Sequence, residues 1–166
     1  HKTEEAINTI DEKLTRYLIS LSGEALSQKE SEVLTNILDS SRDLERIGDH
    51  AEALINLNDY LQRKNVQFSE AALEELAEIY LKTSEFVKDA LESVENNDLE
   101  KAQALIERHE DINNMERVLR KTHIKRLNNG ECSTQAGVNF IDIISHYTRV
   151  SDHAMNLAEK VLAEQI

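Results

Sequence analysis

The sequence is poor in the residues that interrupt helices and in those that build disulfide frameworks. Its 166 residues include no proline, no tryptophan, four glycines and one cysteine. Scarce proline and glycine favour long helices over a sheet. The lone Cys132 cannot form an internal disulfide, which indicates a reducing compartment. No apolar run approaches the roughly 20 residues that a membrane-spanning helix requires.

Positive charge is also scarce. The chain has 19 Lys and Arg against 32 Asp and Glu, a formal net charge of −13. Proteins that bind nucleic acid through its phosphates are usually basic, so this balance argues against a nucleic-acid partner. An acidic surface suits cations or a basic partner, and it also keeps a helical protein soluble whatever its function.

Capping residues and apolar periodicity divide the chain into five predicted helices. Ser69, Asp98 and Ser133 are expected N-caps, while Gly23 and Gly130 lie where helices are expected to stop. Helices of thirty residues are about 45 Å long, so the predicted fold class is all-α, an elongated antiparallel helix bundle. The predicted helices cover roughly residues 2–21, 27–63, 69–97, 98–128 and 134 to nearly the C-terminus.

Apolar residues recur at helical spacing in these segments and predict which face of each helix is buried. In the last helix the spacings of 3 and 4 continue for over five turns, which is typical of near-antiparallel packing. The expected stripes are Ile7, Ile10, Leu14, Tyr17, Leu18 and Leu21 in the first helix; Leu34, Ile37, Leu44, Ile47, Ala51, Leu54 and Leu61 in the second; Leu73, Leu76, Tyr80, Val87, Leu91 and Val94 in the third; and Phe140, Ile143, Tyr147, Val150, Ala154, Leu157 and Val161 in the last.

One helical segment occurs twice. Residues 41–54 read SRDLERIGDHAEAL and residues 145–157 read SHYTRVSDHAMNL, with Asp49 and Asp152 in matching register, 103 residues apart. A shorter match, EAIN at 5–8 and EDIN at 110–113, extends the duplication to the preceding helices. The helix at 69–97 has no upstream counterpart. The prediction is a first repeat over residues 1–65 that lacks its opening helix, and a complete three-helix repeat over residues 66–166.

The first copy of the repeated segment holds two carboxylates on one face. Glu45 and Asp49 are four residues apart, so they lie side by side on a helix and repel each other. This pattern indicates either a cation site or a pair of acids held by basic neighbours such as Arg42 and Arg46. Gly48 between them costs a helix about 1 kcal/mol relative to alanine, which favours close approach of another helix or of a ligand.

The second copy presents a face of mixed acid and imidazole. Carboxylates and imidazoles at such spacing suit zinc, manganese or iron, but the same face is also typical of an interhelical surface held by ion pairs. Both alternatives stay open. The face is Asp142, His146, Arg149 and His153, matched by Asp39, Asp43, Arg46 and His50 in the first copy; Glu5, Asn8, Glu12, Glu110 and Asn113 could supply further oxygens.

Catalytic patterns are missing from the sequence. There is no nucleophile–base arrangement, no phosphate-binding glycine loop and no dinucleotide fingerprint, and Cys132 has no histidine beside it in the sequence. A ferritin-type bundle requires Glu-x-x-His pairs, and neither His50 nor His153 has a glutamate three residues before it. The expectation is a protein that is not an enzyme.

The segment at 41–54 resembles the repeated motif of the PhoU family, phosphate-transport regulators built from two copies of a three-helix bundle. Each copy in that family carries Glu/Asp-x-x-x-Asp on its last helix, associated with bound metal ions. The resemblance implies one and two-thirds three-helix repeats here, with Glu45 and Asp49 as the first metal motif. Asp152 is then the aspartate of the second motif, in which Thr148 stands in place of the first acid. Asp142 and His146 are the candidate ligands that could replace that acid. The implied cofactor is a divalent or ferric ion: Fe, Zn or Mn.

The resemblance also implies a function. It predicts a non-enzymatic regulator of phosphate uptake, whose partner is the membrane domain of a phosphate transporter or a sensor protein. The missing opening helix and the start at His1 rather than Met resemble the C-terminal PhoU-like domain of a sodium–phosphate symporter, cytoplasmic and tethered to the membrane by an upstream transporter domain. The alternatives are a stand-alone dimerisation or scaffold protein and a metal–carboxylate bundle without a transporter role. In either case the chain could form a homodimer.

Overall fold

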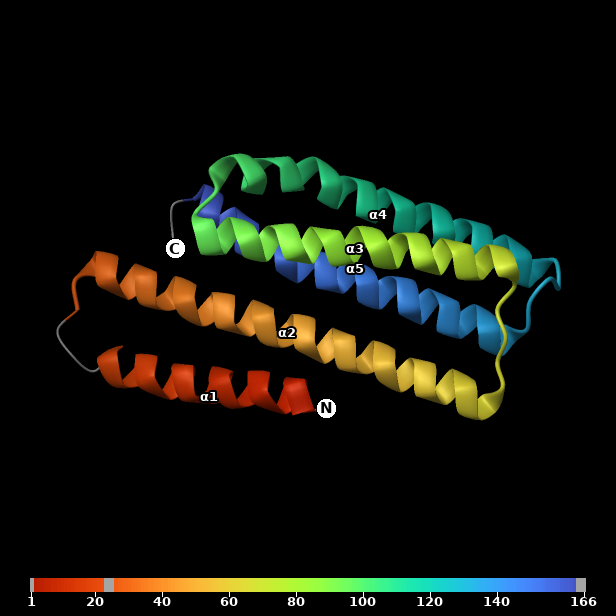
Figure 1. Ribbon diagram of the computed structural model, residues 1–166, viewed down its shortest axis with the longest axis horizontal. Helices are drawn as coiled ribbons and strands as arrows, with labels where there is room; N and C mark the ends of the chain where they lie inside the picture. Colours follow the sequence, from red (N-terminus) through yellow and green to blue (C-terminus); the bar gives the residue numbers. More distant parts are fainter. Residues whose placement is uncertain (1, 23–25, 164–166) are drawn as a thin grey trace.

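The computed structural model describes residues 2–22 and 26–163, and of residues 2–4 the backbone alone. Within these residues five helices run side by side along the long axis of the molecule, and no strand is present (Figure 1). The predicted all-α elongated bundle is confirmed, whereas the predicted stop at Gly23 lies outside the described residues. The helices are α1 (Lys2–Ser22), α2 (Gln28–Lys64), α3 (Glu70–Asn96), α4 (Leu99–Asn128) and α5 (Thr134–Leu162).

Polar caps define most of the helix ends, as predicted. The side chains of Ser69, Asp98 and Ser133 each accept a hydrogen bond from a backbone amide in the first turn of α3, α4 and α5. At the other end of α2 and α3, Asn65 and Asn97 take the left-handed conformation with φ of 48°. Asparagine tolerates this conformation better than most residues, and it ends both helices without a glycine.

The helices form a three-helix bundle and a two-helix hairpin. Helix α5 contacts α2, α3 and α4, and α3 also contacts α4, whereas α1 contacts only α2 (Figure 1). Among the described residues α2 and α3 make no contact, although they are consecutive in the chain. The hairpin α1–α2 therefore joins the bundle α3–α5 only where α2 packs on α5. The predicted boundary between residues 65 and 66 falls in the α2–α3 connection, and the division into two domains stays a prediction.

The core lies between α3, α4 and α5. The predicted stripe of α5 is buried except for the half-buried Tyr147. The predicted stripe of α3 is wrong at Leu73, Tyr80 and Leu91, which are exposed, whereas Leu76, Val87 and Val94 are half-buried and pack against the core as expected. The buried stripe lies one position earlier in the sequence. Its small side chains Ala72 and Ala90 let α3 approach α4 and α5 closely, and the larger Leu73 and Leu91 stay on the open side. The buried residues of α3 are Ala72, Ile79, Thr83, Phe86, Ala90 and Ser93.

The hairpin is much less buried than its sequence predicts. Of the expected stripes on α1 and α2, only Leu18 and Leu61 are buried, while Ile10, Tyr17 and Ile37 are exposed. Two helices side by side bury one contact line, and a third helix is required to cover the apolar face that the pair shares. No helix in the described residues is both long and apolar enough to cross a membrane.

Gly48 of α2 faces α1. The sequence predicts close approach of another helix or of a ligand at this position, and a side chain of α1 is the neighbour found there. A Cβ built there meets only the side chain of Ile7, at 3.3 Å from its Cδ1 atom. This flexible end of a side chain can shift by a few tenths of an ångström. We therefore expect Gly48→Ala to raise the free energy of unfolding by about 0.5–1 kcal/mol through helix propensity, measured by urea unfolding.

Gly130 provides the matched control. It has φ of 71° and open space around its Cα. Gly130→Ala should lower the free energy of unfolding by about 1 kcal/mol, because alanine is strained at that φ. A loss of stability in Gly48→Ala would show that α1 cannot yield and that the glycine is required for packing.

Candidate functional site

The two acids of the first motif share a basic partner. Arg46 lies between them, with its Nη1 3.3 Å from Asp49 Oδ2 and its Nε 3.8 Å from Glu45 Oε2. On the neighbouring helix, Asp11 accepts a hydrogen bond of 2.5 Å from the hydroxyl of Ser41. Ser41 is one helical turn before Glu45 on α2. We call Glu45 and Asp49 the first acidic site.

The second motif contacts α4 and has a different chemistry. His109 Nε2 donates a 3.0 Å hydrogen bond to Asp152, and Arg149 lies 3.3 Å from the same carboxylate. Asn113 lies 3.4 Å from His109 Nε2. Thr148, which replaces the acid, donates its hydroxyl to a backbone carbonyl of its own helix. An imidazole thus takes the place of a second carboxylate beside Asp152.

A buried aspartate joins the two repeats. Asp43 is 9% exposed and accepts hydrogen bonds from three donors on α5: His153 Nδ1 at 3.0 Å, Asn156 Nδ2 at 2.8 Å and Lys160 Nζ at 3.0 Å. Burial alone would raise the pKa of Asp43, but the hydrogen bonds from Asn156, His153 and Lys160 outweigh it and hold the pKa below its ordinary value. Asp43 is therefore ionised, and its carboxylate binds donors of α5 and so holds α2 to α5.

Three histidines continue this interhelical contact. His50 Nδ1 lies 3.0 Å from His146 Nδ1, and the ring of His50 stacks on that of His153 at 5.7 Å between centroids. Burial lowers the pKa of His50, and the neighbouring His146 and His153 lower it further. One neutral imidazole donates to the other. Four of the eight residues of the predicted acid-and-imidazole faces therefore meet between α2 and α5, which favours the interhelical alternative for Asp43, His50, His146 and His153.

The residues predicted to bind metal lie in separate places. Glu45 and Asp49 belong to the first acidic site, Asp152 points to α4, His146 contacts His50 of α2, and Asp142 is exposed. Within the residues whose side chains are described, no group of three or more His, Cys, Asp or Glu is arranged to hold a metal ion. The metal assignment of all five residues stays a prediction.

Two histidine contacts were not predicted from the sequence. His109 follows the same 105-residue offset as the EAIN/EDIN match and occupies the position of Glu4, which was the available signal. His123 is buried, stacks on Phe140 with 4.0 Å between centroids, and brings Nε2 to 3.8 Å from Cys132 Sγ. Burial lowers the pKa of His123, so its imidazole is neutral and its Nε2 atom accepts a weak hydrogen bond from the Cys132 thiol. The spacing of His123 and Cys132 along the chain does not predict this pair, because the turn between α4 and α5 brings the two residues together.

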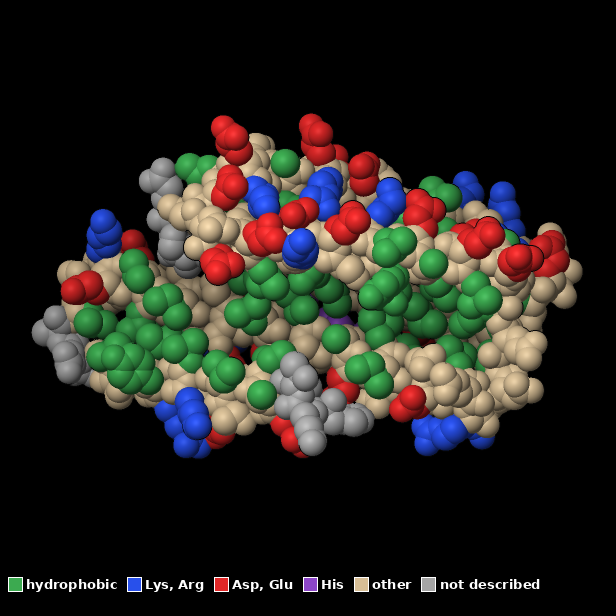
Figure 2. All heavy atoms as spheres, in the orientation of Figure 1, with side chains coloured by type: hydrophobic (Ala, Val, Ile, Leu, Met, Phe, Trp, Pro, Cys, Tyr) green, Lys and Arg blue, Asp and Glu red, His purple; other side chains and the backbone are tan. Residues whose placement is uncertain are grey.

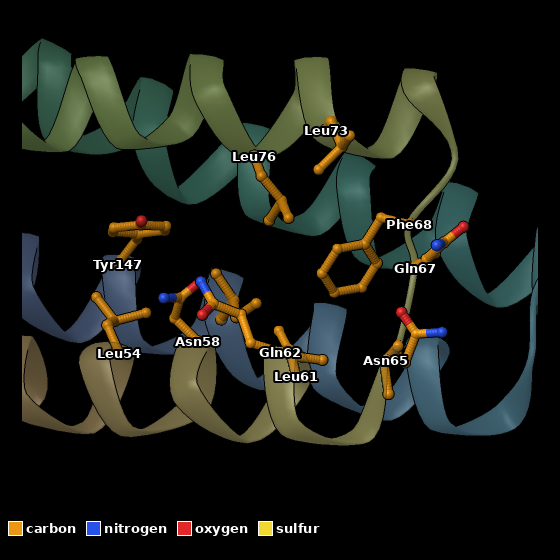
Figure 3. A pocket seen from close by; sticks show the side chains of 12 residues that line it. Leu54, Asn58, Leu61, Gln62, Asn65, Gln67, Phe68, Leu73, Leu76 and Tyr147 are labelled. Atoms are coloured by element: carbon orange, nitrogen blue, oxygen red, sulfur yellow. The ribbon is translucent and has the colours of Figure 1, made fainter.

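An uncharged cavity opens between α2 and α3, away from the acids. It has a volume of about 710 Å³, and none of its 12 lining residues is charged. Figure 3 shows Leu61 of α2 and Leu76 of α3 on opposite sides of it, with Phe68 of the connection and Tyr147 of α5 between them. This cavity is the space left where α2 and α3 diverge, and it shares no residue with the candidate metal ligands.

The two aspartates of α2 should differ sharply in their effect on stability. Asp43→Asn removes the counter-charge of Lys160, whose side chain is itself 13% exposed, so we expect a loss of about 3 kcal/mol in the free energy of unfolding. Asp49→Asn breaks only a half-exposed ion pair and should cost less than about 1 kcal/mol. Urea unfolding of both variants measures the difference, and equal losses would contradict the role given to Asp43.

The pairs α1–α2 and α4–α5 are repeats of one unit, and they meet where α2 packs on α5. Each pair carries an aspartate and an arginine at matching positions, Asp49 with Arg46 and Asp152 with Arg149. The protein is therefore a helical bundle built from tandem repeats. Within this class the sequence matches the family described as PhoU domain over residues 1–57 and 73–161. The chain belongs to the PhoU domain family, and the resemblance seen in the motif is confirmed.

Known relatives agree with this assignment. The chain is 31% identical over 134 residues to the phosphate-specific transport system accessory protein PhoU homolog 1 of Thermotoga maritima, covering 81% of this chain and 57% of that protein. Its fold is similar to the crystal structure of PhoU from Pseudomonas aeruginosa, with a TM-score of 0.88 and 19% identity over 99% of this chain and 79% of the other. The phosphate transport system regulatory protein PhoU of Streptococcus pneumoniae gives a TM-score of 0.81 and 22% identity over 97% and 74%. The chain spans little more than half the length of the curated relative.

Proposed function

We propose that this chain is a non-enzymatic regulatory domain of phosphate uptake that binds a divalent or ferric ion, Fe, Zn or Mn, at Glu45 and Asp49. The observation that carries the proposal is the family match together with an intact Glu-x-x-x-Asp motif in the first repeat. The relative in Thermotoga maritima is named an accessory protein of phosphate-specific transport, which points to the same kind of role.

The first acidic site suits a cation better than the second. Glu45 and Asp49 contribute two carboxylates one helical turn apart, and Arg46 between them has a side chain that is 60% exposed. Moving an exposed arginine away costs little, because such an ion pair is worth about 1 kcal/mol or less. At Asp152 the second acid is absent and a hydrogen bond from His109 occupies the carboxylate. Asp142 and His146 are weaker candidates there.

The proposed partner is the membrane domain of a phosphate transporter or a sensor protein. The particular setting we propose is the cytoplasmic part of a sodium–phosphate cotransporter, held at the membrane by a transporter domain upstream of these residues. A net charge of −13 is compatible with a basic partner surface at the cytoplasmic side and unfavourable for nucleic acid.

The regulatory role is tested by phosphate uptake in cells. A strain lacking the gene for the full protein is complemented with wild type, with Glu45→Gln/Asp49→Asn, or with Asp59→Asn, an exposed position of the same helix outside the motif. We expect wild type and Asp59→Asn to restore the dependence of uptake on external phosphate, and the double variant to lose it. Uptake that responds normally without the protein would contradict the proposal.

Metal binding is tested separately, by elemental analysis of protein purified without chelator or metal-affinity resin. Asp49→Asn should lower the retained Fe, Zn or Mn while helicity stays unchanged, and Asp59→Asn should retain as much as wild type. Absence of metal, with a melting temperature that does not change on adding Mn, Fe or Zn, would remove the metal from the proposal. A loss of helicity in Asp49→Asn would show that the residue is structural.

A further inference from the structure

The cavity between α2 and α3, which we call the α2–α3 cavity, has a chemistry unlike that of the rest of the chain. Charged residues make up 31% of the sequence, but none of the 12 residues that line this cavity is charged. Its volume of about 710 Å³ lies within the range of small-molecule sites in proteins, about 300–1,000 Å³. In Figure 2 hydrophobic side chains lie along the strip between α3 and α2, beneath the charged outer surface of α3 and α4. The cavity therefore suits a ligand whose buried part is small and uncharged.

Apolar and aromatic side chains from three helices and one connection form most of the cavity. Leu61 of α2 and Ile143 of α5 are each 8% exposed, and Leu76 of α3 lies opposite Leu61 (Figure 3). Phe68 and Tyr147 lie toward opposite ends of the cavity in the same view. Aromatic residues make up 4% of the chain but two of the 12 lining residues, so they are enriched here. Their flat apolar faces are surfaces on which planar ligands stack.

Two side-chain amides give the cavity a hydrogen-bonding edge. Asn58 and Gln62 are four residues apart, so they share one face of α2, and Figure 3 shows both amides between Phe68 and Tyr147. Each amide offers donors beside an acceptor. In the part of the chain that the structure describes, neither amide has a hydrogen-bond partner. Their donors and acceptors are therefore available to a ligand.

The connection between α2 and α3 holds the closed end of the cavity in place. Asn65 ends α2 in the left-handed conformation, and the backbone amide of Val66 donates to the carbonyl of Leu61 at 3.0 Å. Phe68 packs edge-on against Phe140, with 6.2 Å between ring centroids. The cavity is thus formed before a ligand arrives, and a formed site loses little conformational entropy when it binds.

We propose that the α2–α3 cavity binds a small, uncharged, planar heterocycle with adjacent hydrogen-bond donors and acceptors on its edge, which is the chemistry of a nucleobase. The ring stacks on apolar side chains such as Leu76 and Phe68. Its edge pairs with the amides of Asn58 and Gln62, as side-chain amides pair with the edge of adenine. A nucleoside suits the cavity better than a nucleotide does, because no lining residue is cationic and a net charge of −13 repels a phosphate group.

A ligand in this cavity connects two helices that otherwise do not meet. Among the described residues α2 and α3 make no contact with each other, yet both contribute to the lining, α2 through Asn58 and Gln62 and α3 through Leu73 and Leu76. The bound ligand therefore fixes the hairpin α1–α2 relative to the bundle α3–α5. Because it binds the folded chain, it also raises the melting temperature as its concentration rises.

The probes are adenosine, guanosine, cytidine and uridine, each titrated into the intact chain and followed by calorimetry and by the NMR signals of the side-chain amides. We expect saturable one-to-one binding of at least one nucleoside, with shifts at Asn58 and Gln62, and at least fivefold weaker binding of its 5′-monophosphate. Asn58→Leu and Gln62→Met keep the size of each side chain but remove its hydrogen bonds. Each should weaken binding about three- to tenfold, the usual net worth of one hydrogen bond.

Asn56→Leu is the matched control. It makes the same substitution at an exposed position of α2 that does not line the cavity, so its binding should stay within about twofold of wild type. Asn58, Gln62 and Asn56 are all exposed positions of one helix, so the three variants should melt close to the wild-type temperature. A loss of binding without a loss of stability then reports on the ligand contact alone.

Three results would overturn the proposal. The first is that none of the four nucleosides binds saturably, and the second is binding that the double variant Asn58→Leu/Gln62→Met leaves unchanged. The third is a nucleotide that binds more tightly than its nucleoside, which would show that the site is a cationic surface elsewhere. None of these measurements involves metal or phosphate uptake, so their outcome is independent of the proposed function.

Discussion

The contact between α2 and α5 is the constraint on which the rest of the structure depends. In the part of the chain that the structure describes, it is the only contact between the hairpin and the three-helix bundle. It contains specific polar interactions: Asp43 accepts hydrogen bonds from three donors, and His50 contacts two other imidazoles. A polar contact of this kind fixes the register of two helices more strictly than an apolar one, because each buried donor and acceptor requires its own partner. The placement of the hairpin relative to the three-helix bundle follows from that register.

The duplicated segment serves two purposes at once. Asp152 points from α5 toward α4 and Asp49 pairs with Arg46 on α2, while His50 and His153, one residue later, point into the contact between the repeats. Successive residues on a helix are about 100° apart, so one short motif provides a carboxylate on one side and an imidazole on the other. The two copies can therefore diverge at the acidic sites, as Thr148 has done, without loosening their mutual contact.

The sequence is sufficient to predict the helices and their duplication, but it predicts only part of the set of residues that the helices bury. Caps such as Ser69 and Asp98 act within one turn, so they are readable locally. The buried face of α3 was misread because Ala72 and Ala90 look less hydrophobic than Leu73 and Leu91, and only the close approach of α4 and α5 selects the smaller stripe. The contacts of His109 and Asp43 depend on how separate helices are placed, which apolar spacing does not encode.

Helix α2 is one uninterrupted rod of 37 residues, about 55 Å long. Asp43 lies on the side of α2 that faces α5, and Ser41 lies on the side that faces α1. A rotation of a continuous helix moves all of its sides together, so a change on the α1 side of α2 also alters the contacts on its α5 side. By thermodynamic reciprocity, a ligand that shifts the contact between α2 and α5 has its own affinity changed by the same factor when that contact is shifted by other means.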